Sequence, residues 1–429
     1  MSSPNSGLTA AWQKICDSLF WMVAIAFILR LAYILVAHTY RFKTADDNFS
    51  FGFEMGRIGR ALAQGQGFSN PFHGVTGPTA WEPPLYPFLI AGVFRLFGVY
   101  SRASAIVLLS INSIFSALTC IPIFLIARRC FDERIARWTS WVWALLPTVM
   151  FWSTRWIWET SLATLLLAII FWLTLVAEEE DGILPWAKFG FLWGMAALIN
   201  TSLLAFLPVS GMWICYQRLR RRKHFLKGAV VSALVFAACV APWSVRNYRT
   251  FEKVIFIRSN FGAELRLGNG PGADGTWMAY LHPTKNARQL RLYREMGEMA
   301  YVAECKCQAI AFIRGSYGRF AMLSMKRFIY YWGGLPKPAE KPALASLQNS
   351  IFLASSVLAF WGLGRALRKR RPGAWLFFWL ILCYPLVYYF VFPHPRYRHP
   401  IEPELGILIL YVISEAEKKR SPPRAPTPA

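Results

Sequence analysis

Runs of about twenty apolar residues recur along this chain of 429 residues, and a helix of that length can cross the hydrocarbon core of a bilayer. Charged residues make up only 16% of the chain, whereas soluble proteins lie nearer a quarter. The high apolar content also excludes a disordered chain. The sequence therefore predicts an all-α polytopic membrane protein. Its candidate spans are 18–38, 101–127, 136–152, 159–177, 226–245, 346–364, 373–391 and 401–414, with a further apolar stretch at 186–217.

The positive charge follows the predicted topology. Lys and Arg outnumber Asp and Glu by 47 to 23, but 19 Trp and 33 Phe in apolar runs argue against a nucleic-acid binder. Short loops rich in Lys and Arg stay cytoplasmic. All four basic clusters fall on one side only if 186–217 forms two helices broken near Asn200. This interpretation predicts about ten spans with both termini cytoplasmic. The clusters lie at 128–137, 218–227, 365–371 and 418–424.

The segments on the outer side carry further helices. In the first outer loop, 39–100, residues 84–97 are too short to span upright and are predicted to form an interfacial or re-entrant helix. Residues 51–64 have apolar residues at helical spacing and are predicted to form a second interfacial helix. The outer segment 246–345 is expected to be mixed and mostly helical, and to be helical from 286 to 332. The predicted division is an N-terminal membrane module at 1–245, an outer segment at 246–345, a C-terminal membrane module at 346–415 and a disordered tail at 416–429.

Acidic residues are almost absent from the predicted spans, where Arg30 is the clear charge. An ion-coupled transporter would need ionisable or broken-helix sites near the midplane. The carboxylates instead emerge at the outer face, in a pattern that suits a substrate with a lipid tail and a polar head. They are Asp46, Asp47, Glu54, Glu82, Glu159, Glu402 and Glu404.

Arginines accompany these acids on the outer side. Arg246 ends the seventh predicted span, Arg258 follows it, and Arg396 and Arg398 lie in a proline-rich stretch before the last span. Guanidinium groups bind phosphate through paired hydrogen bonds. The alternative is that these arginines anchor the protein at lipid headgroups.

Six segments, spread over nearly the whole chain, resemble the GT-C superfamily of polytopic glycosyltransferases. The resemblance is to bacterial family-39-like members, relatives of protein O-mannosyltransferases and of the lipid A aminoarabinose transferase. It implies transfer of a sugar from a polyprenyl-phosphate donor at the outer face of the cytoplasmic membrane. The segments are EMGRIGRALAQGQGFSNPF (54–72), TGPTAWEPPLYP (76–87), WIWETSL (156–162), APWSVRNY (241–248), IRSNFGAELRLGN (257–269) and RYRHPIEP (396–403).

The resemblance also implies roles for particular acids. In that family an acidic residue soon after the first span serves as the base or positions the acceptor. Asp47 has that place and Glu54 heads the segment 54–72, so the base stays open between them. Glu82 resembles the glutamate of a Glu-Lys-Pro site in the aminoarabinose transferase, but Pro83 stands where that site has its lysine. Glu159 matches the acidic residue that begins the fourth span in the family.

The expected chemistry is a direct displacement. A polyprenyl phosphate leaves as a stable anion, so one carboxylate suffices to deprotonate or orient the acceptor hydroxyl, and cations hold the departing phosphate. Such a displacement inverts the anomeric centre. Glu54, Glu82, Glu159 and Asp47 are the catalytic candidates. The candidates for substrate and phosphate binding are Asp46, Arg57, Arg258, Arg396, Tyr397 and Arg398.

Other functions stay open at this stage. A lipid-linked saccharide flippase or transporter, and a polysaccharide polymerase or ligase, would also present a polar outer face. No cofactor is assured, although a divalent metal is possible, and no residue spacing indicates its ligands. The expected location is the inner membrane of a bacterium, with the site facing the periplasm. The expected partners are the bilayer, the lipid-linked donor and an unknown glycan, lipid or protein acceptor, with no nucleic acid.

Overall fold

The computed structural model describes residues 17–42, 49–177, 179–336 and 342–420, and these residues are almost entirely helical. Their only β-type pairing is an isolated bridge between Ser69 and Pro78. In the first half, the helices are α2 (Leu19–Val36), η1 (Phe49–Phe51), α3 (Glu54–Ala63), α4 (Leu85–Phe97), α5 (Arg102–Leu118), α6 (Cys120–Cys130), α7 (Glu133–Leu145), α8 (Pro147–Arg155), α9 (Thr160–Val176), α10 (Leu184–Ile199), η2 (Thr201–Phe206) and α11 (Leu207–Arg220).

The second half continues in the same way. Both expected helices of the first outer loop are present as α3 and α4, and the helical part expected at 286–332 is α14 to α16. In this half, the helices are α12 (Leu226–Phe251), α13 (Phe261–Gly268), η3 (Ala279–Leu281), α14 (Ala287–Met296), α15 (Glu298–Gly315), α16 (Tyr317–Gly333), α17 (Pro342–Arg368), α18 (Ala374–Cys383), α19 (Leu386–Phe390), α20 (Pro395–Arg398), η4 (His399–Ile401) and α21 (Glu402–Arg420).

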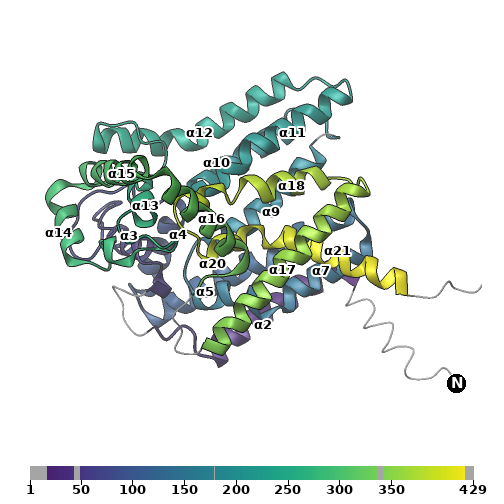
Figure 1. The fold of residues 1–429 in the computed structure, drawn as a ribbon, viewed down its shortest axis with the longest axis horizontal. Coiled ribbons are helices and arrows are strands. Elements are labelled where there is room, and N and C mark those ends of the chain that lie inside the picture. Colours follow the sequence, from purple (N-terminus) through teal and green to yellow (C-terminus); the bar gives the residue numbers. More distant parts are fainter. Residues whose placement is uncertain (1–16, 43–48, 178, 337–341, 421–429) are drawn as a thin grey trace, which may run out of the picture.

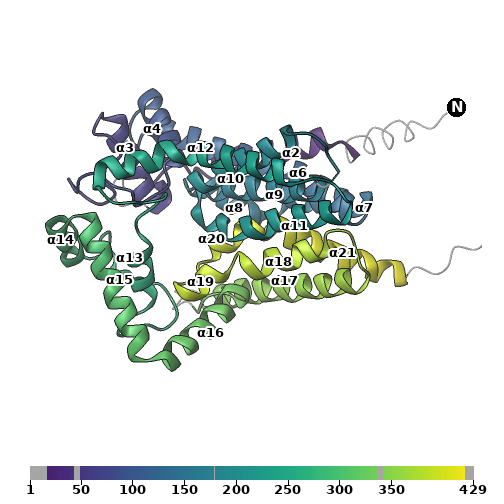
Figure 2. The same ribbon diagram turned by 90° about the horizontal axis from the view of Figure 1, so that it is seen from above.

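The molecule has two ends of different character. The bundle helices run along its long axis, while α3, α4 and α13 to α15 gather at one end (Figures 1 and 2). At the opposite end, ion pairs link the basic loops to nearby acids. They include Arg129–Glu179 and Arg134–Glu417 at 2.7 Å, Arg218–Asp181 at 3.3 Å and Arg365–Glu415 at 3.7 Å.

The stretch 186–217 forms two helices, as the charge pattern predicted. The backbone leaves the helix at Asn200, and its side chain accepts a hydrogen bond from the Ser202 N–H. Asn200 lies beside Glu159 at the start of α9, whereas Arg218 donates to the carbonyl oxygens of Ala177 and Glu180 just after α9. The chain therefore reverses at Asn200, and α11 returns to the basic end.

Four described helical stretches are long and apolar enough to cross a membrane: 19–36, 102–130, 226–251 and 346–368. Shorter apolar helices lie at 85–97, 160–176, 184–199 and 374–390. These features, with the arrangement of the bundle, are those of a multi-pass membrane protein. The count of ten spans and the cytoplasmic placement of both termini stay predictions.

Arg30 braces the bundle. It is fully buried in α2, and its guanidinium donates to Ser116 Oγ on α5 and to the carbonyl oxygens of Trp143 and Ala144 on α7, at 2.9 to 3.1 Å. The carbonyls at the end of α7 have no partner within their own helix, so Arg30 satisfies groups that would otherwise be exposed to an apolar interior. The single charge inside the first span is therefore structural.

Candidate active site

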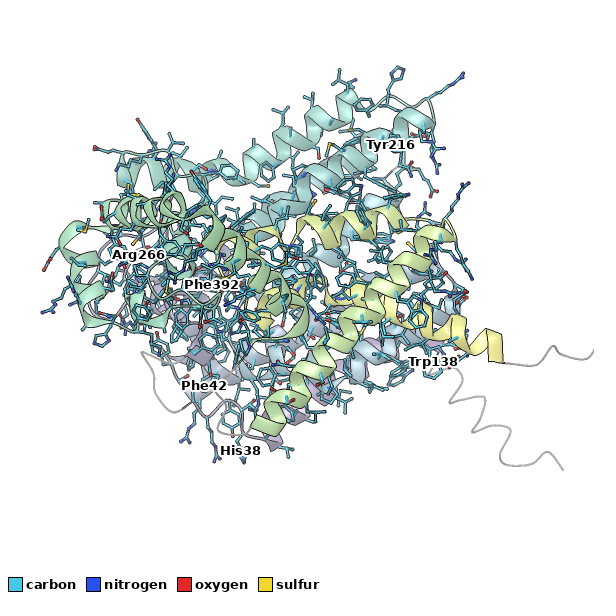
Figure 3. The ribbon with its side chains drawn as sticks, in the orientation of Figure 1. His38, Phe42, Trp138, Tyr216, Arg266 and Phe392 are labelled. Carbon is cyan, nitrogen blue, oxygen red and sulfur yellow. The ribbon has the colours of Figure 1, made fainter. Side chains whose placement is uncertain are left out.

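A cavity of about 260 Å³ lies where the helices at one end of the molecule, among them α3 and α13, meet the bundle. Its walls come from η1 and α3, the loop before α4, the start of α9, the break at Asn200, the segment around α13 and the turn after α19. Figure 3 labels Phe392, which lines this cavity, and Arg266, which lies farther toward the outer helices. The site is therefore assembled from segments that lie hundreds of residues apart.

Six of the predicted site residues line this cavity: Glu54, Glu82, Glu159, Arg258, Arg396 and Tyr397. The glutamates come from the loop regions between α2 and α5 and from the start of α9, and the arginines come from the segment before α13 and from α20. Glu264 lines the cavity as well. Among the described residues, the lining therefore contains four glutamates and two arginines.

Glu82 and Arg258 face each other across the cavity wall. Glu82 Oε2 lies 3.5 Å from an Arg258 guanidinium nitrogen, and the Glu82 side chain is only 8% exposed. Burial raises the pKa of Glu82 to about 8, although the Arg258 charge opposes that shift. The carboxyl therefore changes its charge near neutral pH, which is the range in which a group can exchange protons with a substrate.

Glu159 and Arg396 each keep hydrogen-bonding capacity free. Asn200 donates to Glu159 Oε1 at 3.1 Å, but Oε2 is buried with no hydrogen-bond partner. Arg396 stacks over the Trp158 ring at 3.6 Å, and its Nη1 is also buried without a hydrogen-bond partner. Buried polar atoms normally find partners. The two unpaired atoms belong to side chains that both line the cavity, so this site contains hydrogen-bonding capacity that the protein itself does not use.

Thr284 and His282 contact the carboxyl group of Glu54. The Thr284 hydroxyl donates to Glu54 Oε1 at 2.9 Å, and His282 Nε2 lies 3.7 Å from the same oxygen. The Thr284 N–H donates to His282 Nδ1 at 3.2 Å, so the imidazole carries its proton on Nε2 when it is neutral. Burial lowers the pKa of His282, which favours that neutral form. Glu54 thus faces the cavity as an oriented carboxylate.

Sequence reasoning singled out neither Glu264 nor His282 as a site residue. Both line the cavity, and Asn260 donates to Glu264 Oε1 at 3.0 Å. Burial raises the pKa of Glu264 to about 7, against the effect of Arg258. The signal for Glu264 was its place in the segment 257–269, which carried part of the family resemblance. His282 had no comparable signal, because a single loop histidine is common.

The remaining predicted residues lie elsewhere. Arg57 is buried behind Glu54 and donates to Pro71 O and Thr284 Oγ1 at 3.3 to 3.4 Å. Arg398 does not line the cavity. Its guanidinium is engaged by Glu402 Oε1 at 2.6 Å and by the hydroxyls of Ser355 and Ser356 on α17.

The two aspartates Asp46 and Asp47 lie outside the described residues. Within the part of the chain that the structure describes, no three His, Cys, Asp or Glu side chains are grouped as metal ligands.

Known proteins share this architecture. Residues 81–245 match the family model described as dolichyl-phosphate-mannose-protein mannosyltransferase, a stretch shorter than half the chain. The structure aligns with the oligosaccharyltransferase of Archaeoglobus fulgidus, solved with Zn and sulfate, over 93% of this chain at 14% identity and a TM-score of 0.56. At this identity, the structural likeness is one of fold.

The chain spans about half the length of this oligosaccharyltransferase, covering 49% of it. The same archaeal enzyme, AglB, in complex with an inhibitory peptide and a dolichol-phosphate, aligns at 14% identity and a TM-score of 0.55, over 93% of this chain and 51% of AglB. ArnT from Cupriavidus metallidurans, bound to undecaprenyl phosphate, aligns at 12% identity over 95% of this chain and 81% of ArnT. Its TM-score of 0.41 is too low to support an argument. No curated protein matches the sequence.

Proposed function

We propose that this protein transfers a sugar from a polyprenyl-phosphate donor to an acceptor hydroxyl, at the outer face of a bacterial inner membrane. The observation that carries the proposal is the cavity itself, in which buried carboxylates and guanidinium groups meet at one end of an apolar bundle. A lipid-linked donor needs both parts, because its tail requires the bilayer and its phosphate requires cations. The GT-C fold and the match to the mannosyltransferase family model support a transferase of this class.

The proposed reaction is a single displacement. The acceptor oxygen attacks the anomeric carbon and its proton passes to a carboxylate, while the bond to the phosphate oxygen breaks and the phosphate leaves with the electron pair. Arg396 and Arg258 hold the departing phosphate, whose charge they balance in a dry site. Glu82 and Glu159 orient the substrates. Inversion at the anomeric carbon follows from the direct attack.

Glu54 is the described residue best suited to be the base, and Asp47 stays the alternative. The test is transfer by Glu54→Gln and Asp47→Asn in purified membranes with labelled polyprenyl-phosphate sugars. Loss of the base should lower the rate by about 10² to 10⁴. Glu304→Gln, at an exposed position on α15, is the matched control and should leave the rate unchanged. If both site variants keep full transfer, neither residue is the base.

Arg396 provides a second test of the same proposal. Arg396→Gln removes a guanidinium that lines the cavity and whose Nη1 has no hydrogen-bond partner, so the rate should fall by about 10² to 10³. Arg396→Lys should also be slow, because an ammonium keeps the charge but loses the planar fork and the stacking on Trp158. The measurement is the initial rate at saturating acceptor, with Arg314→Gln at an exposed position as the control. Unchanged rates in both Arg396 variants would remove it from the phosphate site.

Two other activities would give different results in the same membranes. A flippase or transporter would speed the movement of the lipid-linked sugar across the bilayer without forming a transfer product. A polymerase or ligase would join lipid-linked oligosaccharides instead of moving single sugars. If no sugar is transferred from any donor while scrambling is stimulated, the enzyme proposal fails.

A further inference from the structure

A buried carboxylate outside the cavity ties together the two segments that carry Glu82 and Arg258. Glu298, the first residue of α15, is 4% exposed and accepts four hydrogen bonds. The Ala80 N–H donates to its Oε1 at 2.7 Å and the Ser259 hydroxyl donates to the same oxygen at 2.7 Å. The Thr79 and Tyr293 hydroxyls donate to its Oε2.

Two of these donors are sequence neighbours of the cavity pair. Ala80 lies two residues before Glu82, and Ser259 directly follows Arg258. The same two segments also meet through the Ser259 N–H, which donates to Ala80 O at 2.8 Å, and through Arg258 Nε, which donates to Trp81 O at 3.3 Å. One carboxylate thus sets the register between 79–82 and 257–259.

The charge of Arg246 also acts on Glu298. Arg246 on α12 is the charged group that faces it, and Arg246 donates to Thr79 O at 2.6 Å, so the segment 79–82 is held from two sides. Glu298 itself does not line the cavity. Its four donors satisfy the carboxylate without any substrate, so direct contact with the reacting atoms is not its role.

We infer that Glu298 is a positioning residue, which holds Glu82 and Arg258 at their working separation for the proposed transfer reaction. The catalytic consequence of this inference rests on the proposed function. The clamp, by which we mean the hydrogen bonds of Glu298 that join 79–82 to 257–259, does not depend on it. A glutamine at 298 has one acceptor oxygen and an NH2 group, which would face donors such as the Ala80 N–H. Glu298→Gln should therefore release 79–82 and 257–259 from each other.

The experiment compares two losses of one hydrogen bond to the same carboxylate. Ser259→Ala removes a donor on one of the two segments, whereas Tyr293→Phe removes a donor on α14 and keeps the ring that packs against Trp81. Amide hydrogen exchange in detergent should rise over 79–82 and 257–260 in Glu298→Gln and in Ser259→Ala. It should stay at the parental level there in Tyr293→Phe and in Glu304→Gln.

Transfer kinetics give the second readout. Arg258 lowers the pKa of Glu82, so loosening the pair should move the Glu82 limb of the pH–rate profile to higher pH in Ser259→Ala. The charged groups that act on Glu82 are Arg258, Arg396, Glu54, Glu159 and Glu264. A role limited to overall stability would lower the melting temperature in both single-bond variants without moving this limb in either.

The outcomes separate the two proposals. If exchange over 79–82 and 257–260 stays parental in Glu298→Gln, or rises equally in Tyr293→Phe, the positioning role is wrong whatever the transfer assay gives. If the parent protein transfers no sugar, the proposed function fails, and the exchange data alone still decide whether the clamp exists. A released clamp with an unmoved pH–rate limb would also overturn the positioning role.

Discussion

Four glutamates share one buried cavity with two arginines, so their charges are coupled. For Glu82 and Glu264 burial is the largest influence and raises the pKa, while the charge of Arg258 opposes it. A carboxyl that is removed from water holds its proton more tightly. Glu82 and Glu264 therefore add negative charge to the cavity as the pH rises through neutrality.

The raised pKa of Glu264 has a consequence for stability. The folded state holds this proton more tightly than the unfolded state, so the free energy of unfolding falls as the pH rises from the ordinary value of 4.5 to about 7. Glu264→Gln removes this contribution, and the variant should lose less stability than the parent between about pH 5 and pH 8. Thermal unfolding in detergent across this range is the measurement.

The comparison for that prediction is Glu304→Gln, at an exposed position on α15. This variant should follow the parental pH dependence. If Glu264→Gln loses as much stability as the parent on going from acid to neutral pH, the carboxyl does not hold its proton in the folded state.

At the scale of elements, helices α10 and α12 approach each other closely through small residues. A Cβ at Gly190 would lie 2.2 Å from Ser232 O, and one at Gly194 would lie 2.5 Å from the Cys239 side chain. Glycines spaced by four residues let helix backbones come into contact within a membrane. Close packing here holds the outer end of α10, where Asn200 reaches Glu159.

Gly190→Leu should therefore separate α10 from α12. We expect a loss of about 2 kcal/mol or more, because overpacking a tight contact forces the backbones apart. Gly211→Leu on α11 is the matched control, since a Cβ at Gly211 meets no atom within 4 Å. The melting temperatures of the two variants in detergent are compared. Equal values would mean that the α10–α12 contact does not contribute to stability.

At the scale of the whole molecule, charge separates the two ends of the bundle. The basic loops and their ion pairs lie at one end, and the cavity lies at the other. In a membrane, this arrangement predicts that the cavity faces outward, because short loops rich in Lys and Arg stay cytoplasmic.

Cysteine labelling tests this orientation. Cys307 on α15 is exposed and should react with an impermeant maleimide added outside intact cells. In a Cys307→Ser background, Arg291→Cys on α14 should react from outside, whereas Lys223→Cys should react only after the membrane is opened. Ready labelling at position 223 from outside would reverse the predicted topology.

Much of the architecture could be predicted because it depends on local composition. Apolar length located the long helices, and the basic clusters required the break at Asn200, which the structure contains. The gathering of Glu54, Glu82 and Glu159 near one end followed from the same topology. The role of Glu298 could not be predicted, and the only signal for Glu264 was its place in the segment 257–269, because the contacts of both residues depend on packing between distant segments.

By itself, the sequence determined the helical membrane class, the helix break and the family resemblance, because these depend on hydrophobicity, charge and short motifs along the chain. The tertiary structure decided which of the acids and arginines share a cavity. Arg396 lines the cavity and its Nη1 has no hydrogen-bond partner, whereas Arg398, two residues later, is bound by Glu402 and by hydroxyl groups on α17. The reason is physical: the partner of a buried charge is set by packing between distant segments, as with Glu298, which joins residues 79–80 to 259.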